Sequence, residues 1–231
     1  MPLLAGAHTS GSVLDVPQSE ARRGPLHEDH EALGAKFGDF AGWLMPLEFD
    51  GGGVLAEHSA VRQRVGLFDV SHMGTFVVSG SGAKDGLNEV FTNDLNRISA
   101  GQAQYSLLCN ERGGVIDDVF VYLAADDRII VVPNAANASI VIGTVERVLE
   151  SSDVRVEDRS KSTAIIAVQR PASQQVIEAV GLPGDLDYLR FVELDTDNGH
   201  VLVARTGYTG ERGYELLVDA AAAQYWWGQL R

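Results

Sequence analysis

The stretch from residue 104 to residue 132 constrains the fold most, because its side chains alternate and two turn signals interrupt it. Gly113-Gly114 marks the first turn and Asp126-Asp127 marks the second. A period of two between short turns is typical of neighbouring antiparallel strands. The stretch therefore predicts a three-stranded meander, with strands over residues 105–109, 115–123 and 129–132.

Helical segments flank the meander and place the chain in the α+β class, with antiparallel sheets and helices packed on them. The predicted helices cover residues 54–64, 83–91, 135–149, 171–180 and 220–231. Further strands are predicted at residues 75–79, 164–168, 189–194, 201–206 and 214–218. In the first helix, Val54, Ala60 and Val61 are available for an inward face.

The two halves of the chain have a similar order of elements. FVVSGSGAKDGLNEVF and IIAVQRPASQQVIEAV each combine a strand, a short turn and a helix. The similarity favours an internal duplication, although strings this weakly alike also arise by chance. The first residues are small, polar and rich in Pro and Gly, which is typical of a tail. We predict a disordered tail over residues 1–26, a first subdomain over 27–160 and a second, incomplete subdomain over 161–231.

The last predicted helix carries a large apolar area in Trp226, Trp227 and Leu230. Burying one large aromatic side chain contributes on the order of 1.5–3 kcal/mol, so such a helix is expected to pack under another part of the fold. One interpretation is that the partner of this helix follows residue 231 and that the chain is truncated. The alternative is that the helix docks back on the core formed by the preceding residues.

Composition argues against two classes of partner. The formal net charge is −14, whereas contacts with nucleic-acid phosphates need a basic surface. No apolar run approaches the length that spans a bilayer, and the first residues lack a basic leader. We expect no nucleic-acid partner, no membrane span and, in a bacterium, a cytoplasmic location.

Cys109 is the single cysteine, which excludes an intramolecular disulfide and favours strand packing.

Two adjacent carboxylates, Asp117 and Asp118, begin the second strand of the meander. Successive side chains of a strand point to opposite faces, so one carboxylate can face a pocket while the other faces solvent or caps the turn. Asp118 then shares a face with Phe120 and Tyr122. An acid beside aromatic rings can hold a ring that carries a basic nitrogen. The alternative is that both aspartates are turn residues.

Two further stretches combine glycine turns with functional groups. RTGYTGERGYE, at 205–215, offers two tyrosines and a strand-borne Glu215, or is merely a hairpin with solvated charges. DVSHMG, at 69–74, carries His72 as a candidate base or ligand. No His or Cys accompanies His72 at the spacing of metal ligands, so we predict no metal site and favour packing or a loop hydrogen bond.

Six stretches taken together carry a family resemblance: HEALGAKFGDFAGWLMP, VGLFDVSHMG, TNDL, QYSLLCNERGGVIDDVFVY, VVPNAAN and RTGYTGERGYELL. They occur in the same order and at similar spacings as in the T-protein family of the glycine cleavage system, the aminomethyltransferases. The resemblance covers residues 27–231. Its most specific part is DVSHMG followed by GGVIDD and RTGYTGE.

The resemblance implies a fold of two related halves and a C-terminal β-barrel, with folate in a central hole. The downstream GLGARD segment and the barrel of the family are missing from this sequence. The implied reaction moves an aminomethyl group from the lipoyl arm of H-protein to tetrahydrofolate, which releases ammonia and forms 5,10-methylenetetrahydrofolate. The implied partners are lipoylated H-protein and tetrahydrofolate as acceptor substrate, with no metal.

Site residues follow from the matching motifs. The resemblance implies that Asp118 is the catalytic acidic residue near folate N10 and that Glu215 hydrogen-bonds the pterin ring. The implied lining of the folate cavity is Asn134, Tyr105, Tyr122, Tyr208 and Met73.

The sequence departs from the family at Gln169-Arg170-Pro171, where relatives commonly have a glycine at the middle position. The effect of this bulkier, charged turn cannot be predicted from the sequence. An arginine of the missing downstream segment normally helps to hold the glutamate tail of folate. Two alternatives therefore remain: a folate-binding relative without transferase activity, and an inactive fragment that only docks H-protein.

Overall fold

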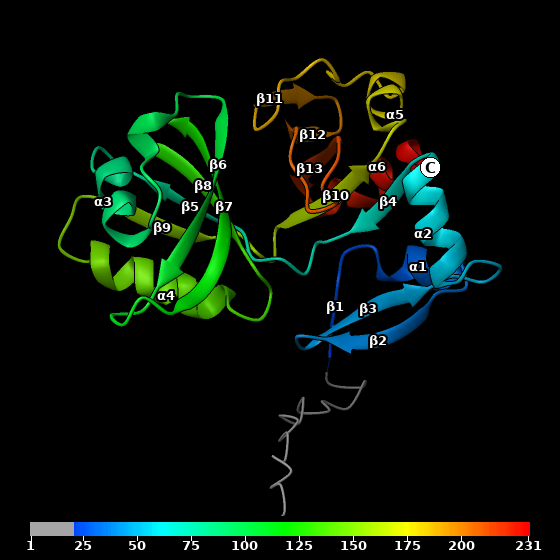
Figure 1. Cartoon of the computed structure of the whole chain (residues 1–231), viewed down its shortest axis with the longest axis horizontal. Coiled ribbons are helices and arrows are strands. Elements are labelled where there is room, and N and C mark those ends of the chain that lie inside the picture. The colour runs from blue at the N-terminus through cyan, green and yellow to red at the C-terminus, as the bar shows by residue number, and fades with distance from the viewer. Residues whose placement is uncertain (1–20) are drawn as a thin grey trace, which may run out of the picture.

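The computed structural model describes residues 21–231 and shows an α+β fold (Figure 1), as predicted. Two five-stranded antiparallel sheets form two lobes, and a three-stranded sheet lies beside the second lobe. The strands are β1 (Arg22–Arg23), β2 (Lys36–Phe40), β3 (Trp43–Glu48), β4 (Gly66–Asp69), β5 (Phe76–Ser79), β6 (Gln102–Cys109), β7 (Val115–Ala125), β8 (Arg128–Pro133), β9 (Arg155–Asp158), β10 (Thr163–Gln169), β11 (Phe191–Thr196), β12 (Gly199–Ala204) and β13 (Gly213–Asp219). The α-helices are α1 (His27–Ala32), α2 (Val54–Gln63), α3 (Ala83–Val90), α4 (Ala138–Leu149), α5 (Ser173–Ala179) and α6 (Ala223–Leu230).

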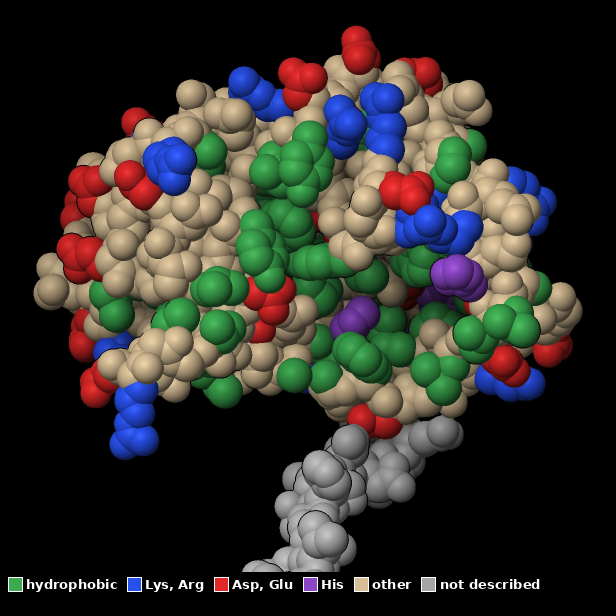
Figure 2. Space-filling view, viewed as in Figure 1, with side chains coloured by type: hydrophobic (Ala, Val, Ile, Leu, Met, Phe, Trp, Pro, Cys, Tyr) green, Lys and Arg blue, Asp and Glu red, His purple; other side chains and the backbone are tan. Residues whose placement is uncertain are grey.

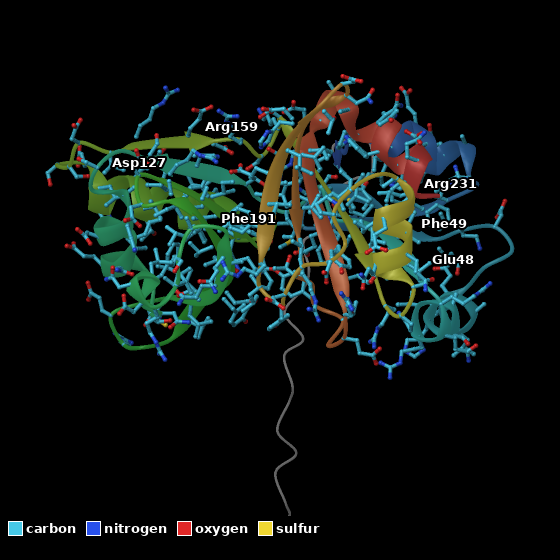
Figure 3. The ribbon with its side chains drawn as sticks, turned by 90° about the horizontal axis from the view of Figure 1, so that it is seen from above. Glu48, Phe49, Asp127, Arg159, Phe191 and Arg231 are labelled. Atoms are coloured by element: carbon cyan, nitrogen blue, oxygen red, sulfur yellow. The ribbon has the colours of Figure 1, made fainter. Side chains whose placement is uncertain are left out.

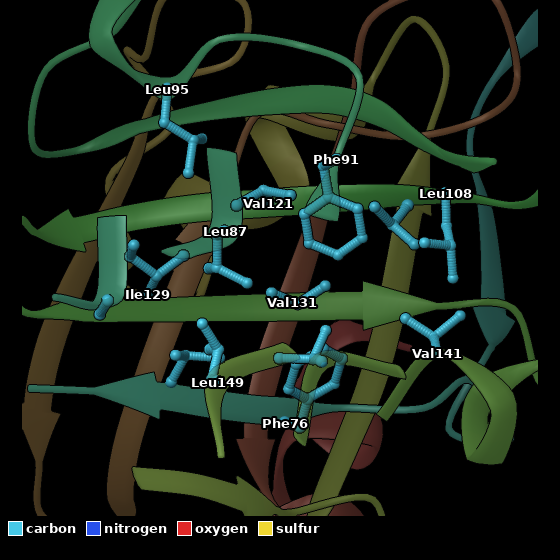
Figure 4. Close-up of a cluster of buried hydrophobic side chains, with 14 of the residues drawn as sticks. Phe76, Leu87, Phe91, Leu95, Leu108, Val121, Ile129, Val131, Val141 and Leu149 are labelled. Carbon is cyan, nitrogen blue, oxygen red and sulfur yellow. The ribbon is translucent and has the colours of Figure 1, made fainter. Parts of the chain in front are cut away.

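The first sheet has the strand order β6-β7-β8-β5-β9, and the predicted meander forms its first three strands. Val119, Val121 and Leu123 of β7 point to one face, where they are fully buried. Leu87 of α3 and Leu149 of α4 pack on this face (Figure 4). The alternation of β7 therefore gives the first lobe its own core, because every second residue reaches the same side.

The second sheet repeats this arrangement with the order β11-β12-β13-β10-β4. Its strand β10 leads into α5, as β5 of the first sheet leads into α3. Each sheet then places three consecutive strands on one side of that strand and an edge strand on the other. The two lobes are related subdomains, as the two similar sequence strings predicted.

The edge strand of the second sheet comes from the first half of the chain. β4 pairs antiparallel with β10, from Gly66 opposite Gln169 to Asp69 opposite Ile166. All strands of the first sheet lie within residues 76–158. The sheets therefore do not follow the boundary predicted at residue 160, because the segment that includes β4 joins the second lobe.

The N-terminal part of the described chain also belongs to the fold. Arg22–Arg23 pair in parallel with β3, and the Arg22 guanidinium lies 4.6 Å from the centre of the Trp43 ring. Leu26 is fully buried in the core of the second lobe. The tail predicted over residues 1–26 is thus wrong for 21–26, and its first twenty residues lie outside the described range.

Helix α2 forms where the sequence predicted it, but it has no buried residue. Val54, expected on an inward face, is 74 % exposed, and the neighbouring Leu55 is 87 % exposed. Ala60 and Val61 are only half-buried. The prediction of an inward face is wrong because α2 lies beside the edge strand β4 and not over a sheet face (Figure 1).

Helix α6 docks on the core of the second lobe. Trp226 and Trp227 are 3 % and 4 % exposed, and both pack with Leu230 in that core. The ring of Trp227 also meets His30 edge-on, with 5.0 Å between ring centres. The tryptophans thus find packing partners within the described residues, and the helix docks on the core formed by the preceding residues. Across residues 21–231, every helix falls short of the length and apolarity that a membrane crossing needs.

The remaining faces of the two sheets pack against each other (Figure 3). Phe120, Tyr122 and Val132 of the first sheet meet Ile165 and Leu217 of the second in a third core. This core joins the lobes. The candidate site lies beside it, so its walls come from both halves of the chain.

Candidate functional site

A cavity of about 300 Å³ lies between the two sheets. Its lining comes from both lobes and from the segment after β4, and Figure 2 shows apolar side chains along the groove between the lobes. The lining residues are Phe40, Val70, His72, Met73, Asp118, Tyr122, Val132, Asn134, Ala135, Ala136, Ile165, Tyr208, Glu215 and Leu217. A larger hollow beside α2 holds none of the residues predicted for the site.

Six of the seven residues predicted for the site line this cavity: Met73, Asp118, Tyr122, Asn134, Tyr208 and Glu215. The seventh, Tyr105, lies beside it and is 46 % exposed. Aromatic contacts connect Tyr105 to the wall, since its ring centre lies 5.7 Å from that of Phe120, which lies 5.3 Å from that of Tyr208. The structure thus brings the predicted residues together at one place.

Glu215 supplies a buried carboxylate at the deep side of the site. It is 4 % exposed, and its Oε2 accepts hydrogen bonds from the hydroxyl groups of Thr206 and Tyr122, the latter at 3.3 Å. Burial raises the pKa of Glu215, whereas the two hydroxyl donors lower it, and burial prevails. No described residue donates to Oε1, so one oxygen is left for a ligand with N–H donors.

Asp118 supplies a second carboxylate, which is only half-buried. The side-chain amide of Asn134 donates to Asp118 Oδ1 at 3.2 Å and to the carbonyl of Asp118 at 3.0 Å. Partial burial and the neighbouring Asp118 carboxylate raise the pKa of Tyr105. Asp118 therefore lies on the same side of β7 as Phe120 and Tyr122, as the alternation predicted, and Asp118 and Tyr122 both line the cavity.

Asp117 is the residue whose importance the sequence did not reveal. It is 3 % exposed, rather than solvated, and accepts three hydrogen bonds from the segment between β8 and α4. The donors are the backbone N–H of Asn134 at 3.0 Å and the side-chain amides of Asn134 and Asn137 at 3.1 and 2.7 Å. Asp117 thus fixes Asn134, which in turn orients Asp118. The signal in the sequence was the pair of asparagines in PNAAN, but the sequence alone does not show where that loop lies.

The DVSHMG segment is held by its aspartate. Asp69 Oδ2 lies 2.9 Å from His30 Nε2, and Asp69 Oδ1 accepts the backbone N–H of Ser71 at 2.9 Å. Burial alone would raise the pKa of Asp69, but the hydrogen bonds from His30 and Ser71 outweigh it and lower that pKa. These contacts bring His72 and Met73 to the cavity wall. Burial lowers the pKa of His72, with Asp69 acting in the opposite direction, so the neutral imidazole is favoured.

The loop after β12 carries Tyr208 and is packed tightly on Gln169. A Cβ atom on Gly207 or Gly213 would lie 2.4 or 2.1 Å from Oε1 of Gln169, so a larger residue at either position would have to displace that side chain. Gly207 also has a φ of +147°, which favours glycine. Gln169 is buried and donates to the carbonyls of Thr206 and Tyr214. Gly207 and Gly213 therefore serve close packing, and the loop is not a freely solvated hairpin.

Arg170 adopts a backbone φ of +95°, in the region that glycine prefers. For a non-glycine residue this conformation costs on the order of 1–3 kcal/mol. The arginine is nevertheless buried, and its guanidinium contacts the carbonyl of Thr209 and the carboxylate of Glu211. The positive φ gives a physical reason for a glycine at this place in a related sequence.

The cavity therefore offers two carboxylates with different surroundings, an amide and several aromatic rings. Among residues 21–231, no group of three or more His, Cys, Asp or Glu side chains is arranged to hold a metal ion. A flat, mostly apolar molecule with N–H donors at one edge fits such a lining, because the rings cover its faces and the carboxylates accept its donors.

Comparison with known sequences decides the family. The family described as the GCVT N-terminal domain matches residues 26–231, which is nearly the whole chain. The chain belongs to this family. As a GCVT domain it is 49 % identical over 199 residues to the aminomethyltransferase of Frankia alni, and 48 % identical over 200 residues to that of Mycobacterium avium. These matches cover 86 % and 87 % of this chain.

The GCVT domain spans about half the length of the curated relatives it matches, 54 % for both of these enzymes. Among solved structures it resembles the glycine cleavage system aminomethyltransferase T from Bartonella henselae, with a TM-score of 0.85 and 36 % sequence identity. That match covers 90 % of this chain and 56 % of the other. The fold described above is therefore the fold of aminomethyltransferase T over the shared part.

Proposed function

We propose that this GCVT domain binds tetrahydrofolate in the cavity between its two sheets and carries the catalytic carboxylate of an aminomethyltransferase. The observation that supports it most is the pairing of a buried carboxylate, Glu215, with an accessible one, Asp118, across an aromatic cavity. The names of the relatives, which are aminomethyltransferases, support the same reaction class.

In this proposal the pterin ring lies deep in the cavity, with its N–H edge against Glu215. The Thr206 and Tyr122 hydroxyl groups hold Glu215 Oε2 in place, so Oε1 can accept a hydrogen bond from the ring. Tyr208 and Met73 lie beside the ring at the cavity wall. A carboxylate fixed before the ligand arrives contributes more to binding than a mobile one, because its orientation costs nothing on binding.

The proposed donor is the S–CH2–NH3+ group on the lipoyl arm of H-protein. The methylene carbon forms bonds to N5 and N10 of tetrahydrofolate, and its bonds to sulfur and to nitrogen break. The protons of N5 and N10 leave with the thiol and the ammonium that are released. Asp118 stabilises the cationic carbon and accepts the N10 proton in a hydrogen bond, which is electrostatic stabilisation by a preorganised group.

Replacement of Asp118 by Asn tests this assignment and also separates an enzyme from a folate binder without transferase activity. The variant keeps the size and the hydrogen bond to Asn134 but loses the charge. We expect 5-formyltetrahydrofolate to bind with an affinity within about threefold of wild type in calorimetry, while turnover with aminomethylated H-protein falls at least 100-fold. Normal turnover in the variant would refute the role of Asp118. Folate binding without turnover in the wild-type chain would favour the binder, or a fragment that only docks H-protein.

A further inference from the structure

The segment from Thr206 to Gly213 carries Tyr208, which lines the cavity and whose ring centre lies 5.3 Å from that of Phe120. Tyr208 is 53 % exposed, so little covers its outer side. Without contacts to hold it, a segment with glycines at 207, 210 and 213 could adopt many conformations. Its position in the folded protein therefore depends on the contacts that hold it.

Gln169 and Arg170, at the end of β10, supply those contacts. Gln169 Oε1 accepts the Thr209 hydroxyl at 2.8 Å, and its amide donates to the carbonyl of Thr206. The guanidinium of Arg170 donates to the carbonyl of Thr209 and forms an ion pair with Glu211. Arg170 also binds through its backbone, since its N–H donates to the carbonyl of Arg212 at 2.8 Å. The two residues thus hold the segment on both sides of Tyr208.

Arg170 keeps these contacts although its backbone is in a conformation that glycine would adopt more easily. The ion pair also extends outward, because Arg62 of α2 lies 3.1 Å from Glu211. The guanidinium of Arg170 lowers the pKa of Glu211, so this carboxylate stays ionised and paired at neutral pH. A strained residue that makes directed contacts to a ligand-bearing loop indicates a positioning role.

We propose that Arg170 is a positioning residue for folate: it holds the Thr206–Gly213 segment so that the Tyr208 ring is already in place when the ligand enters. This inference rests on the proposed function and deepens it, because it names the group that prepares the mouth of the same cavity. Without the Arg170 side chain the segment would keep its Gln169 contacts but lose those at Thr209 and Glu211. Part of its ordering would then occur during binding, and the affinity would fall by that cost. Arg170 itself does not line the cavity, so it acts through Tyr208.

The test is a double-mutant cycle with 5-formyltetrahydrofolate as the ligand in calorimetry. Arg170→Gly removes the side chain and suits the positive φ, so the variant is expected to fold. We expect its Kd to rise five- to tenfold. Tyr208→Ala should also raise the Kd, but adding Arg170→Gly to it should change the Kd by less than twofold, because Arg170 acts through the missing ring.

Two controls make the result specific. Arg62→Gln removes the outer partner of Glu211 but leaves the contacts of Arg170, and it should change the Kd by less than twofold. Arg170→Lys keeps the charge beside Glu211, and it should restore part of the affinity lost in Arg170→Gly.

The positioning role would be overturned, with folate binding intact, by an unchanged Kd in Arg170→Gly. It would also be overturned if the fold-increases in Kd from Arg170→Gly and Tyr208→Ala multiplied in the double variant. Failure of the folded wild-type chain to bind 5-formyltetrahydrofolate would instead overturn the folate assignment, and the positioning role with it.

Discussion

Glu215 and Asp118 are both carboxylates in one cavity, but their surroundings give them different properties. Glu215 is almost fully buried, and burial raises its pKa. Asp118 is half-buried and held by an asparagine amide. A desolvated carboxylate favours a ligand that brings N–H donors to it, whereas an accessible one can follow charge that develops during a reaction. In the proposed function, Glu215 therefore recognises the ligand and Asp118 takes part in the reaction.

Glu215→Gln is expected to stabilise the free protein in a way that depends on pH. A carboxyl group whose pKa is raised in the folded state adds stability below its unfolded pKa, near 4.5, and loses that stability as the pH rises through the folded value. Glutamine has no charge to desolvate and can still accept from Thr206 and Tyr122. The gain in melting temperature over wild type should thus be near zero at pH 4 and a few degrees at pH 7.5. An equal difference at both pH values, measured by differential scanning calorimetry, would contradict this.

The contribution of Asp69 to stability should change with pH in the opposite direction. Its pKa is lowered in the folded state, so its contribution to stability is complete above about pH 4 and is lost as the pH falls through the folded value. Asp69→Asn should therefore destabilise the protein at pH 7 by about 2–3 kcal/mol, because it removes a charged acceptor of His30 and Ser71. The difference from wild type should shrink below pH 4. Urea unfolding at pH 7 and pH 3 measures this difference, and a constant value would argue against an ionised Asp69 carboxylate.

Asp117→Ala should cost about 2–3 kcal/mol of unfolding free energy, because it leaves the buried donors of Asn134 and Asn137 without an acceptor. Asp127, an exposed aspartate in the next turn, provides the matched control. Its replacement by Ala should change the unfolding free energy by less than about 0.5 kcal/mol. Equal effects in urea unfolding would show that Asp117 does not hold the loop.

At the scale of elements, the meander and the helices on it could be predicted from local patterns, because the period of β7 alone puts Val119 on one face and Asp118 on the other. The hydrogen-bond partners of Asp117 could not be predicted, because they depend on how the loop before α4 folds back over β7. The pairing of β4 with β10 could not be predicted either, because it joins residues about a hundred positions apart. The exposed α2 shows the same limit, since a helical pattern does not say which surface the helix meets.

Replacing glycine by alanine at one crowded and one open position tests how closely the loop between β12 and β13 is packed. Gly213→Ala would put a Cβ atom 2.1 Å from buried Gln169, so it should destabilise the protein by 2 kcal/mol or more, roughly the cost of overpacking a core. Gly143→Ala, inside α4, meets nothing within 4 Å and should stabilise by up to about 1 kcal/mol. Chemical unfolding of both variants measures whether the unfolding free energy falls in Gly213→Ala and rises in Gly143→Ala. A neutral Gly213→Ala would mean that the loop packs less closely than described.

At the scale of the whole molecule, the two lobes are related in topology but depend on each other. They share the core around Phe120 and Leu217, and the cavity takes walls from both. The cavity therefore exists only when both lobes are folded and docked. Two similar strings, and site motifs spread over both halves, indicated this arrangement in the sequence. The third core, between the sheets, could not be predicted from the sequence.

We propose that this docked pair of lobes forms a folate site around Glu215. The most direct measurement is a calorimetric titration of the 231-residue chain with 5-formyltetrahydrofolate, alongside the Glu215→Gln variant and the Arg97→Gln variant as an exposed control outside the cavity. We expect saturable binding by the wild-type chain and by Arg97→Gln, and at least tenfold weaker binding by Glu215→Gln in a protein that is equally folded. Equal affinity in all three, or no binding by the folded wild-type chain, would contradict the proposal.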